Sequence, residues 1–124
     1  TSNILIIDNI GMLSRLYCYA DITYVGGGFG DDGVHNVLEP AVYGKPVIYG
    51  PEFEKFIEAI ELTACGGGIS IASALELEKV LAEFWNDELL LKSSGESAKN
   101  YVYSNSGATK KIIAFIQEKR LLIN

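Results

Sequence analysis

Short apolar runs divide the chain at intervals. They cover residues 4–7, 22–25, 47–49 and 69–71, and a continuous apolar run is typical of a strand buried on both faces of a parallel sheet. Between the runs, apolar residues recur every three or four positions, which is the spacing of one helix face. The predicted order is βαβαβαβ followed by three helices. Strands that alternate with helices indicate an α/β fold of about four parallel strands joined by right-handed crossovers.

Capping residues help to place the helices. Gly44 suits the C-terminal cap of a short helix, and Ser73 with Glu76 forms a capping box at the start of a later one. Gly95 is a weak point in the helix that Asp87 opens. The predicted helices cover about 12–20, 36–43, 53–64, 73–86, from Asp87 past Tyr101, and from Gly107 to near Lys119 and Arg120.

The third predicted helix has a well-marked apolar face. Its apolar residues are spaced i, i+3, i+4, i+7 and i+11, which places them on one side of a helix. We therefore expect this side to be buried against the sheet. The face consists of Phe53, Phe56, Ile57, Ile60 and Ala64.

Composition narrows the class of protein. The 124 residues, expected to form a single domain over 1–124, are 48% hydrophobic, enough for a core. The net charge of -6 argues against a nucleic-acid surface, which needs clustered Lys and Arg to neutralise phosphates. No apolar run approaches the roughly 20 residues of a membrane span. Cys18 and Cys65 are isolated, so we expect buried free thiols and no metal site.

The stretch from Tyr24 to Pro51 concentrates the unusual backbone requirements of the chain. Five of the thirteen glycines lie between Gly26 and Gly33. Three of them fit the G-x-G-x-x-G pattern of a dinucleotide-binding turn, placed after a strand and before a helix. Two features argue against binding of NAD at this turn. The pattern follows the second predicted strand, and the acidic residue expected about 20 positions later is replaced by the run 49–51, Tyr-Gly-Pro.

Polar residues follow the glycine turn at the start of the next helix. Asn36 and Glu39 are three positions apart and form either a capping box or a pair that binds sugar hydroxyls. His35, the only histidine, is either structural or a donor to a phosphate or base. A phosphate would bind backbone N–H groups from Val34 to Asn36. The sequence contains no paired carboxylates or nucleophile–histidine set, so no catalytic residue is assigned.

Several linked motifs resemble one family. They are Asp8-Asn-Ile-Gly-Met-Leu-Ser-Arg-Leu-Tyr17, Val25-Gly-Gly27, Gly33-Val-His-Asn-Val-Leu-Glu-Pro40, Gly44-Lys-Pro46 and Gly50-Pro51. Together they resemble the C-terminal half of the 3-deoxy-D-manno-octulosonic acid (Kdo) transferases over about residues 4–71.

The resemblance implies a Rossmann-like half domain of a GT-B glycosyltransferase. Such enzymes transfer Kdo with inversion from CMP-Kdo to a lipid A precursor in lipopolysaccharide biosynthesis, at the cytoplasmic face of the inner membrane. An N-terminal segment anchors them, and their catalytic base lies in the N-terminal domain. Thr1 enters strand-like sequence without an initiator Met, so the chain is expected to be a soluble piece of a longer protein, inactive alone and with no cofactor beyond the donor. By position, the donor site comprises Gly26, Gly27, Gly28, His35, Asn36 and Glu39.

Three positions depart from the family pattern. This chain has Gly28 where the family usually has Ser, Val34 where it usually has a glycine, and Met12 where Glu is common. Strands that the family places between the first two predicted here are missing, so the pieces must pair directly, form a homodimer or leave an edge exposed. The alternative functions are a non-catalytic nucleotide-binding module and an NAD-dependent oxidoreductase domain.

Overall fold

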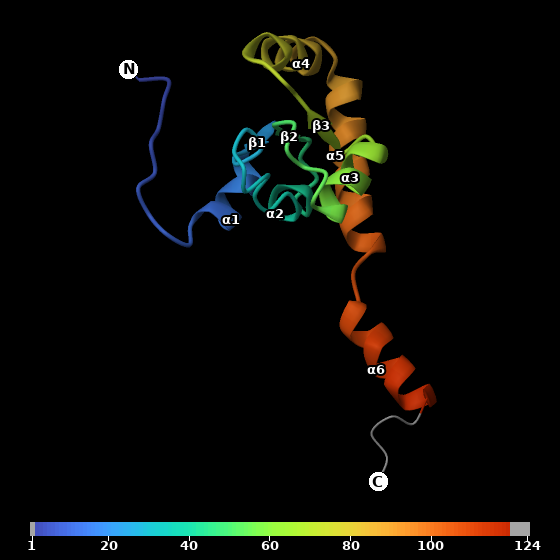
Figure 1. Ribbon diagram of the computed structural model, residues 1–124. Helices are drawn as coiled ribbons and strands as arrows, with labels where there is room; N and C mark the ends of the chain where they lie inside the picture. The colour runs from blue at the N-terminus through green and yellow to red at the C-terminus, as the bar shows by residue number, and fades with distance from the viewer. Residues whose placement is uncertain (1, 120–124) are drawn as a thin grey trace.

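A parallel sheet lies at the centre of the protein (Figure 1). The computed structural model describes residues 2–119. Its three strands are β1 (Thr23–Val25), β2 (Val47–Tyr49) and β3 (Gly68–Ser70), in the spatial order β1-β2-β3. Both neighbouring pairs are parallel. The α/β fold is therefore confirmed.

Helices follow and separate the strands, and the C-terminal part is entirely helical, as predicted. Ser73 accepts a hydrogen bond from the backbone N–H of Glu76 at 3.2 Å, and Asp87 accepts one from that of Leu90 at 3.0 Å, so both predicted N-terminal caps are confirmed. Residue 120, predicted near the end of the last helix, lies outside the described residues. The helices are α1 (Leu13–Leu16), the 3-10 turn η1 (Tyr17–Tyr19), α2 (Leu38–Ala41), α3 (Ile57–Ala64), α4 (Ala74–Asn86), α5 (Glu88–Ser104) and α6 (Ala108–Lys119).

The predicted first strand, at residues 4–7, is wrong. This segment is extended but pairs with no described strand, and Figure 1 shows it leading away from the sheet. Ile4, Leu5 and Ile6 are 77%, 82% and 85% exposed. A strand requires a neighbour for its backbone N–H and C=O groups, so apolar sequence without a partner remains irregular. Over residues 2–119 the sheet therefore has three strands and not the predicted four.

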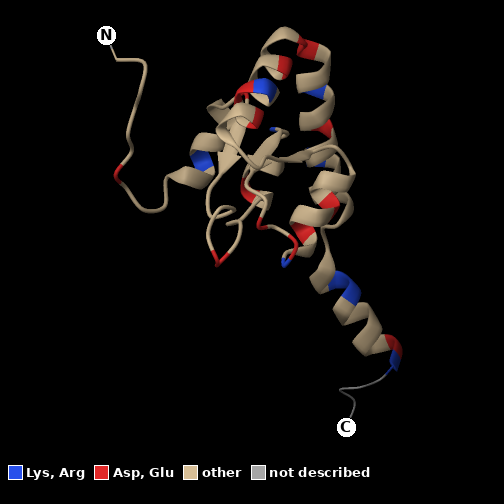
Figure 2. Ribbon diagram, turned by 45° about the horizontal axis from the view of Figure 1, so that its top comes forward, with Lys and Arg blue, Asp and Glu red and all other residues tan. Residues whose placement is uncertain are grey.

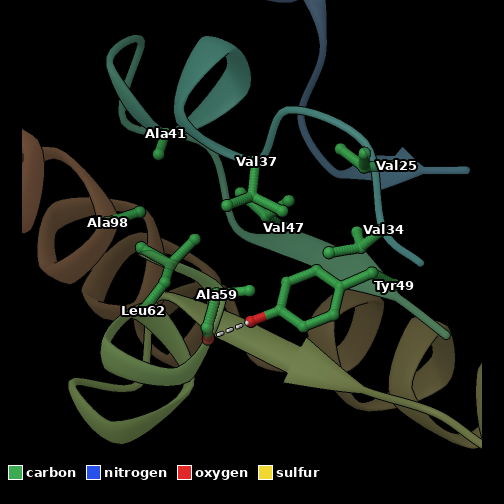
Figure 3. Close-up of a cluster of buried hydrophobic side chains, with 9 residues drawn as sticks. All are labelled: Val25, Val34, Val37, Ala41, Val47, Tyr49, Ala59, Leu62 and Ala98. Atoms are coloured by element: carbon green, nitrogen blue, oxygen red, sulfur yellow. Dashed lines mark hydrogen bonds between the residues drawn. The ribbon is translucent and has the colours of Figure 1, made fainter. Parts of the chain in front are cut away.

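The side chains of β2 alternate between the two faces of the sheet. Val47 and Tyr49 point into one core, which α2, α3 and the second half of α5 complete. Figure 3 shows this core, with the Tyr49 hydroxyl donating to the carbonyl of Ala59 at 2.9 Å. Ile48 points to the opposite face, where it packs with Phe84 of α4. Both faces of the central strand are thus covered, as its continuous apolar sequence predicts.

Helix α5 crosses close to the backbone of its neighbours and is continuous through Gly95. A Cβ at Gly95 would run into the carbonyl oxygen of Gly44, and one at Gly67 would lie 2.6 Å from the Cα of Ala98. Gly95, predicted as a weak point of the helix, is therefore a contact point for close packing. Gly44 has a φ of +70° but lies two residues beyond Val42, the C-cap of α2, so it turns the chain after the helix and is not its predicted cap.

Helix α3 buries a different face from the predicted one. Ala59 and Leu62 are fully buried, whereas Ile57 is 61% and Ile60 39% exposed. The apolar spacing alone did not determine which side of α3 faces the core, because a short helix with apolar residues on two sides can bury either side. The free thiols are also exposed and not buried as expected, at Cys18 and Cys65.

Charged residues are spread over the body of the protein, where Figure 2 shows Asp and Glu interspersed with Lys and Arg. Lys110, Lys111 and Lys119 lie on α6, which extends away from the body in Figure 1. Among the described residues, the helices are too short or too polar to span a membrane.

Candidate functional site

The glycine-rich segment after β1 forms two consecutive tight turns. The N–H of Gly30 donates to the carbonyl of Gly27 at 2.9 Å, and the N–H of Gly33 donates to that of Gly30 at 3.1 Å. Gly27 and Gly33 have φ angles of +90° and +84°, a backbone region that residues with a Cβ rarely adopt. The glycine spacing thus builds a compact loop at the carboxyl end of the sheet.

This loop is fastened to the segment that follows β2. The N–H of Glu52 donates to the carbonyl of Gly28 at 2.8 Å, and the carbonyl of Glu52 accepts from the N–H of Val34 at 2.9 Å. A Cβ at Gly28 would lie 2.6 Å from the nitrogen of Gly50. Gly28 therefore serves the contact between two backbone segments, and its predicted contact with a donor stays a prediction.

His35 lies directly over the glycine turn. Its N–H donates to the carbonyl of Gly26 at 3.0 Å, and its imidazole occupies the space where a Cβ of Gly27 would be, with Nε2 at 2.8 Å from that position. Apart from its two chain neighbours, no described residue has an atom within 4 Å of the Cβ position of Gly26, so this glycine has open space beside it. The structure therefore brings together Gly26, Gly27 and His35.

Asn36 and Glu39 lie in contact at the start of α2. The Oδ1 of Asn36 accepts a hydrogen bond from the N–H of Leu38 at 3.0 Å, and its Nδ2 donates to Oε1 of Glu39 at 3.3 Å. Asn36 is not the predicted N-cap: α2 has Val37 at that position, without a side-chain cap bond, so the bond to Leu38 closes a turn just before the helix and no capping box forms. Glu39 bonds to a side chain and not to a backbone N–H, so its second carboxylate oxygen has no hydrogen-bond partner among the described residues.

The predicted phosphate site on the backbone is mostly occupied by the protein itself. Of the N–H groups from Val34 to Asn36, that of Val34 donates to Glu52 and that of His35 to Gly26. Only the N–H of Asn36 has no partner among the described residues. An anion bound here would therefore depend on this one amide and on side chains.

A hollow of about 320 Å³ opens beside these residues. One wall is the segment 34–38, which includes His35 and Asn36, and the other wall is formed by Phe56 and Glu58 at the start of α3. Glu39 lies outside the hollow lining. Glu58 and Phe56 were not predicted as site residues, because their approach to residues 34–38 depends on how α3 packs.

Tyr17 is a third residue that the sequence did not assign to the site. Burial raises the pKa of its hydroxyl, and the negative charge of nearby Glu39 raises it further. The residue lies in η1, which contacts α2. The sequence placed Tyr17 in the helix predicted over 12–20, and its nearness to Glu39 follows only from how η1 packs against α2.

The described residues contain no group of three or more His, Cys, Asp or Glu side chains arranged to hold a metal ion. The candidate chemistry of the site is therefore hydrogen bonding by one imidazole, one amide and two carboxylates, next to an apolar wall. Such a set of a few polar groups in an apolar hollow is typical of small-molecule recognition.

The relatives that this chain resembles are longer proteins, and the chain matches one part of each. No family model matches it. It is 30% identical over 125 residues to a bifunctional glycosyltransferase/methyltransferase of Fusobacterium nucleatum, which covers 98% of the chain and 18% of that protein. It is 39% identical over 82 residues to the 3-deoxy-D-manno-octulosonic acid transferase of Aquifex aeolicus, which covers 65% of the chain and 23% of that enzyme. The chain thus spans about a fifth of these relatives.

One solved structure has a similar fold. It is the C-terminal CMP-Kdo binding domain of WaaA from Acinetobacter baumannii, with a TM-score of 0.69 and 20% sequence identity. The match covers 77% of this chain and 51% of that one. The three-stranded sheet and its helices therefore correspond to about half of a known α/β domain.

Proposed function

Because the chain belongs to the 3-deoxy-D-manno-octulosonic acid (Kdo) transferase family, of which it matches the C-terminal part, we propose that it binds the nucleotide-sugar donor of a glycosyltransferase. The solved domain of similar fold is described as binding CMP-Kdo, so CMP-Kdo is the proposed donor. The whole enzyme would transfer Kdo with inversion to a lipid A precursor at the cytoplasmic face of the inner membrane, as a step of lipopolysaccharide biosynthesis.

The observation that carries this proposal is the pairing of Asn36 and Glu39 beside the glycine turn. Asn36 holds one carboxylate oxygen of Glu39, which orients the other oxygen for a ligand. A carboxylate accepts hydrogen bonds only, so it suits the paired hydroxyls of a ribose. His35, whose N–H donates to the carbonyl of Gly26, and the open side of Gly26 are the proposed neighbours of the phosphate.

Binding and chemistry are assigned to different parts of the enzyme in this proposal. The residues that line the hollow offer recognition groups: they include one carboxylate, that of Glu58, and no Ser, Thr or Cys that could act as a nucleophile. We therefore assign the catalytic base to another domain of the full enzyme. The chain alone is expected to bind CMP and to transfer no sugar.

Titration with CMP tests the proposal. We expect the amide resonances from Gly26 to Glu39 to shift in a saturable way, and Glu39→Gln to weaken CMP binding about tenfold, because an amide presents one acceptor in place of two. Glu78→Gln on α4, an exposed carboxylate outside the hollow, is the matched control and should bind CMP like the wild type. Absence of shifts in residues 26–39 at saturating CMP would overturn the proposal.

A further inference from the structure

Helix α6 exposes an apolar face that is bordered by lysines. Its four large apolar residues are spaced i, i+1, i+3 and i+4, which places them on one side of the helix, and three of them are 49–58% exposed. Lys110 and Lys111 precede two of these residues by three and four positions and therefore flank the face. The Nζ of Lys119 lies 6.0 Å from the ring centroid of Phe115. The apolar residues are Ile112, Ile113, Phe115 and Ile116. An exposed apolar face of this kind, rimmed by charge, indicates a surface for a partner.

A groove of the opposite charge runs along the outer side of α4. Two hollows of about 430 Å³ each share Lys79 and Ala82 in their linings, so they adjoin and form one groove that continues to the start of α5. Leu75 at one end of the groove is 75% exposed, and Leu90 at the other end is 41% exposed. Four carboxylates but only one lysine line it, and these acidic residues are Glu76, Glu78, Glu83 and Asp87.

The two surfaces match in length, polarity and charge. Helix α6 has 12 residues and α4 has 13, so both are about 20 Å long. All but one of the 16 Asp and Glu residues precede α6, and its three lysines are therefore a basic patch on an acidic chain. We propose that α6 docks in the α4 groove of a second copy of this chain. Its apolar face covers Leu75, Ala82 and Leu90, and its lysines lie beside the carboxylates of the rim. This contact goes beyond donor binding and does not depend on it.

Helix α6 cannot lie in the groove of its own chain. Figure 1 shows α4 and α6 at opposite ends of the molecule, joined through α5. The 17 residues of α5 span about 25 Å, whereas the linker 105–107 spans at most about 11 Å. The contact therefore forms between two copies. Two copies related by a two-fold axis make both contacts at once, because each presents α4 at one end and α6 at the other, and the assembly closes as a dimer.

Charge favours a second copy over other partners. Two α6 helices that paired with each other would bring their lysines together, and like charges repel. An anionic lipid surface would attract α6 but repel a chain whose net charge is -6. The α4 groove is a surface of this molecule that offers both carboxylates and apolar side chains to α6.

Charge reversal on the two surfaces tests the contact in the whole chain. Sedimentation equilibrium of the wild type should show a dimer in the micromolar range that dissociates as salt is added, because salt screens exposed charges. Lys110→Glu with Lys111→Glu, and separately Glu78→Lys with Glu83→Lys, place like charges in both contacts. Each double variant should weaken the dimer by about tenfold or more. An equimolar mixture of the two double variants should dimerise again, because opposite charges then meet in both contacts.

Further variants separate the contact from the fold. Phe115→Ala removes apolar surface but keeps a good helix former, and it should weaken the dimer by about tenfold. Lys92→Glu and Glu96→Lys, on the exposed side of α5 and outside both surfaces, are the matched controls and should dimerise like the wild type. Circular dichroism verifies the helix content of every variant.

Four results would overturn the proposal. They are a wild type that stays monomeric at all concentrations, a mixture of the two double variants that fails to dimerise, assemblies that grow beyond the dimer, and a monomeric chain that binds phosphatidylglycerol vesicles through α6. The last result would assign α6 to a membrane surface. None of the four bears on CMP binding, which is measured separately, so failure of the dimer and failure of the donor-binding proposal are distinguishable.

Discussion

The imidazole of His35 lies against the Cα of Gly27, in the space that any other residue at position 27 would fill with its Cβ. Nε2 of His35 is 2.8 Å from that Cβ position, and the φ of Gly27 is +90°. The position therefore requires glycine for two independent reasons, the backbone conformation and the place of the imidazole. The glycine turn and the polar segment after it form one structural unit.

Gly27→Ala should disturb both the fold and the site. A left-handed conformation costs a residue with a Cβ about 1–2 kcal/mol, and the new methyl group must displace His35. We expect a free energy of unfolding lower by about 1–3 kcal/mol in urea titrations, together with weaker CMP binding. Gly66→Ala is the matched control, because Gly66 has a similar φ of +82° but open space at its Cβ position and lies outside the site. Equal losses in both variants would contradict the assigned contact.

Asn36→Asp separates the two roles of Asn36. The variant keeps an oxygen to accept from the N–H of Leu38, so the helix start should stay within about 0.5 kcal/mol of the wild type. It loses the Nδ2 donor to Glu39 and places two carboxylates side by side, which repel each other and a phosphate. We expect CMP affinity to fall more than tenfold in calorimetric titrations. Asn100→Asp on exposed α5 surface is the control, and unchanged affinity in Asn36→Asp would refute the role.

Local patterns predicted the elements that depend on nearby residues. The runs at 22–25, 47–49 and 69–71 form the strands, with ends shifted by one residue at most, and the Ser73 cap is present. The run at 4–7 has the same apolar character but forms no strand. Residues 4–7 form no strand because they have no neighbouring strand among the described residues. An apolar sequence favours a strand, but it does not supply the partner for the backbone hydrogen bonds.

The site shows the same division between local and distant contacts. Asn36 and Glu39 are three residues apart, so the spacing placed them on the same side of the chain, although neither interpretation of the pair predicted their direct hydrogen bond. Glu58 and Tyr17 approach this segment only through the packing of α3 and η1, and apolar periodicity carries no information on such approaches. The misassigned face of α3 illustrates the difficulty, since the sequence favoured Ile57 and Ile60 over the buried Ala59 and Leu62.

Substitution of two isoleucines tests the corrected strand assignment. Ile6 is 85% exposed and Ile48 fully buried. Ile6→Ala should change the free energy of unfolding by less than about 0.5 kcal/mol, whereas Ile48→Ala should lower it by about 2–5 kcal/mol through lost burial and a cavity. Urea titrations followed by circular dichroism measure both. A large loss in Ile6→Ala would indicate that residues 4–7 pack against something after all.

Gly95→Ala should reverse the usual effect of this substitution. In an exposed helix interior, alanine stabilises by about 1 kcal/mol relative to glycine. Here the Cβ would run into the carbonyl oxygen of Gly44, so α5 must move outward. We expect a net loss of about 1–3 kcal/mol and a lower melting temperature. Asn100→Ala, on the exposed surface of the same helix, should be neutral or stabilising, and a stabilised Gly95→Ala would show that α5 does not pack so closely.

Tyr49 should make the stability of the fold depend on alkaline pH. Burial raises the pKa of its hydroxyl above the ordinary value of 10.0, so above that pH the unfolded chain loses this proton while the folded chain keeps it. The unfolded state then binds fewer protons, and the free energy of unfolding falls as the pH rises from about 10 through the folded pKa.

Tyr49→Phe tests this dependence directly. The variant loses the bonds to Ala59 and Thr63 at a cost of about 1 kcal/mol at pH 7, because the Ala59 carbonyl still accepts from Thr63 at 2.8 Å. Its stability should then decline less steeply above pH 10 than that of the wild type, in urea titrations at pH 9 to 11. Tyr24→Phe, on the exposed side of β1, should keep the wild-type stability at pH 7. An unchanged alkaline slope in Tyr49→Phe would exclude Tyr49 as its source.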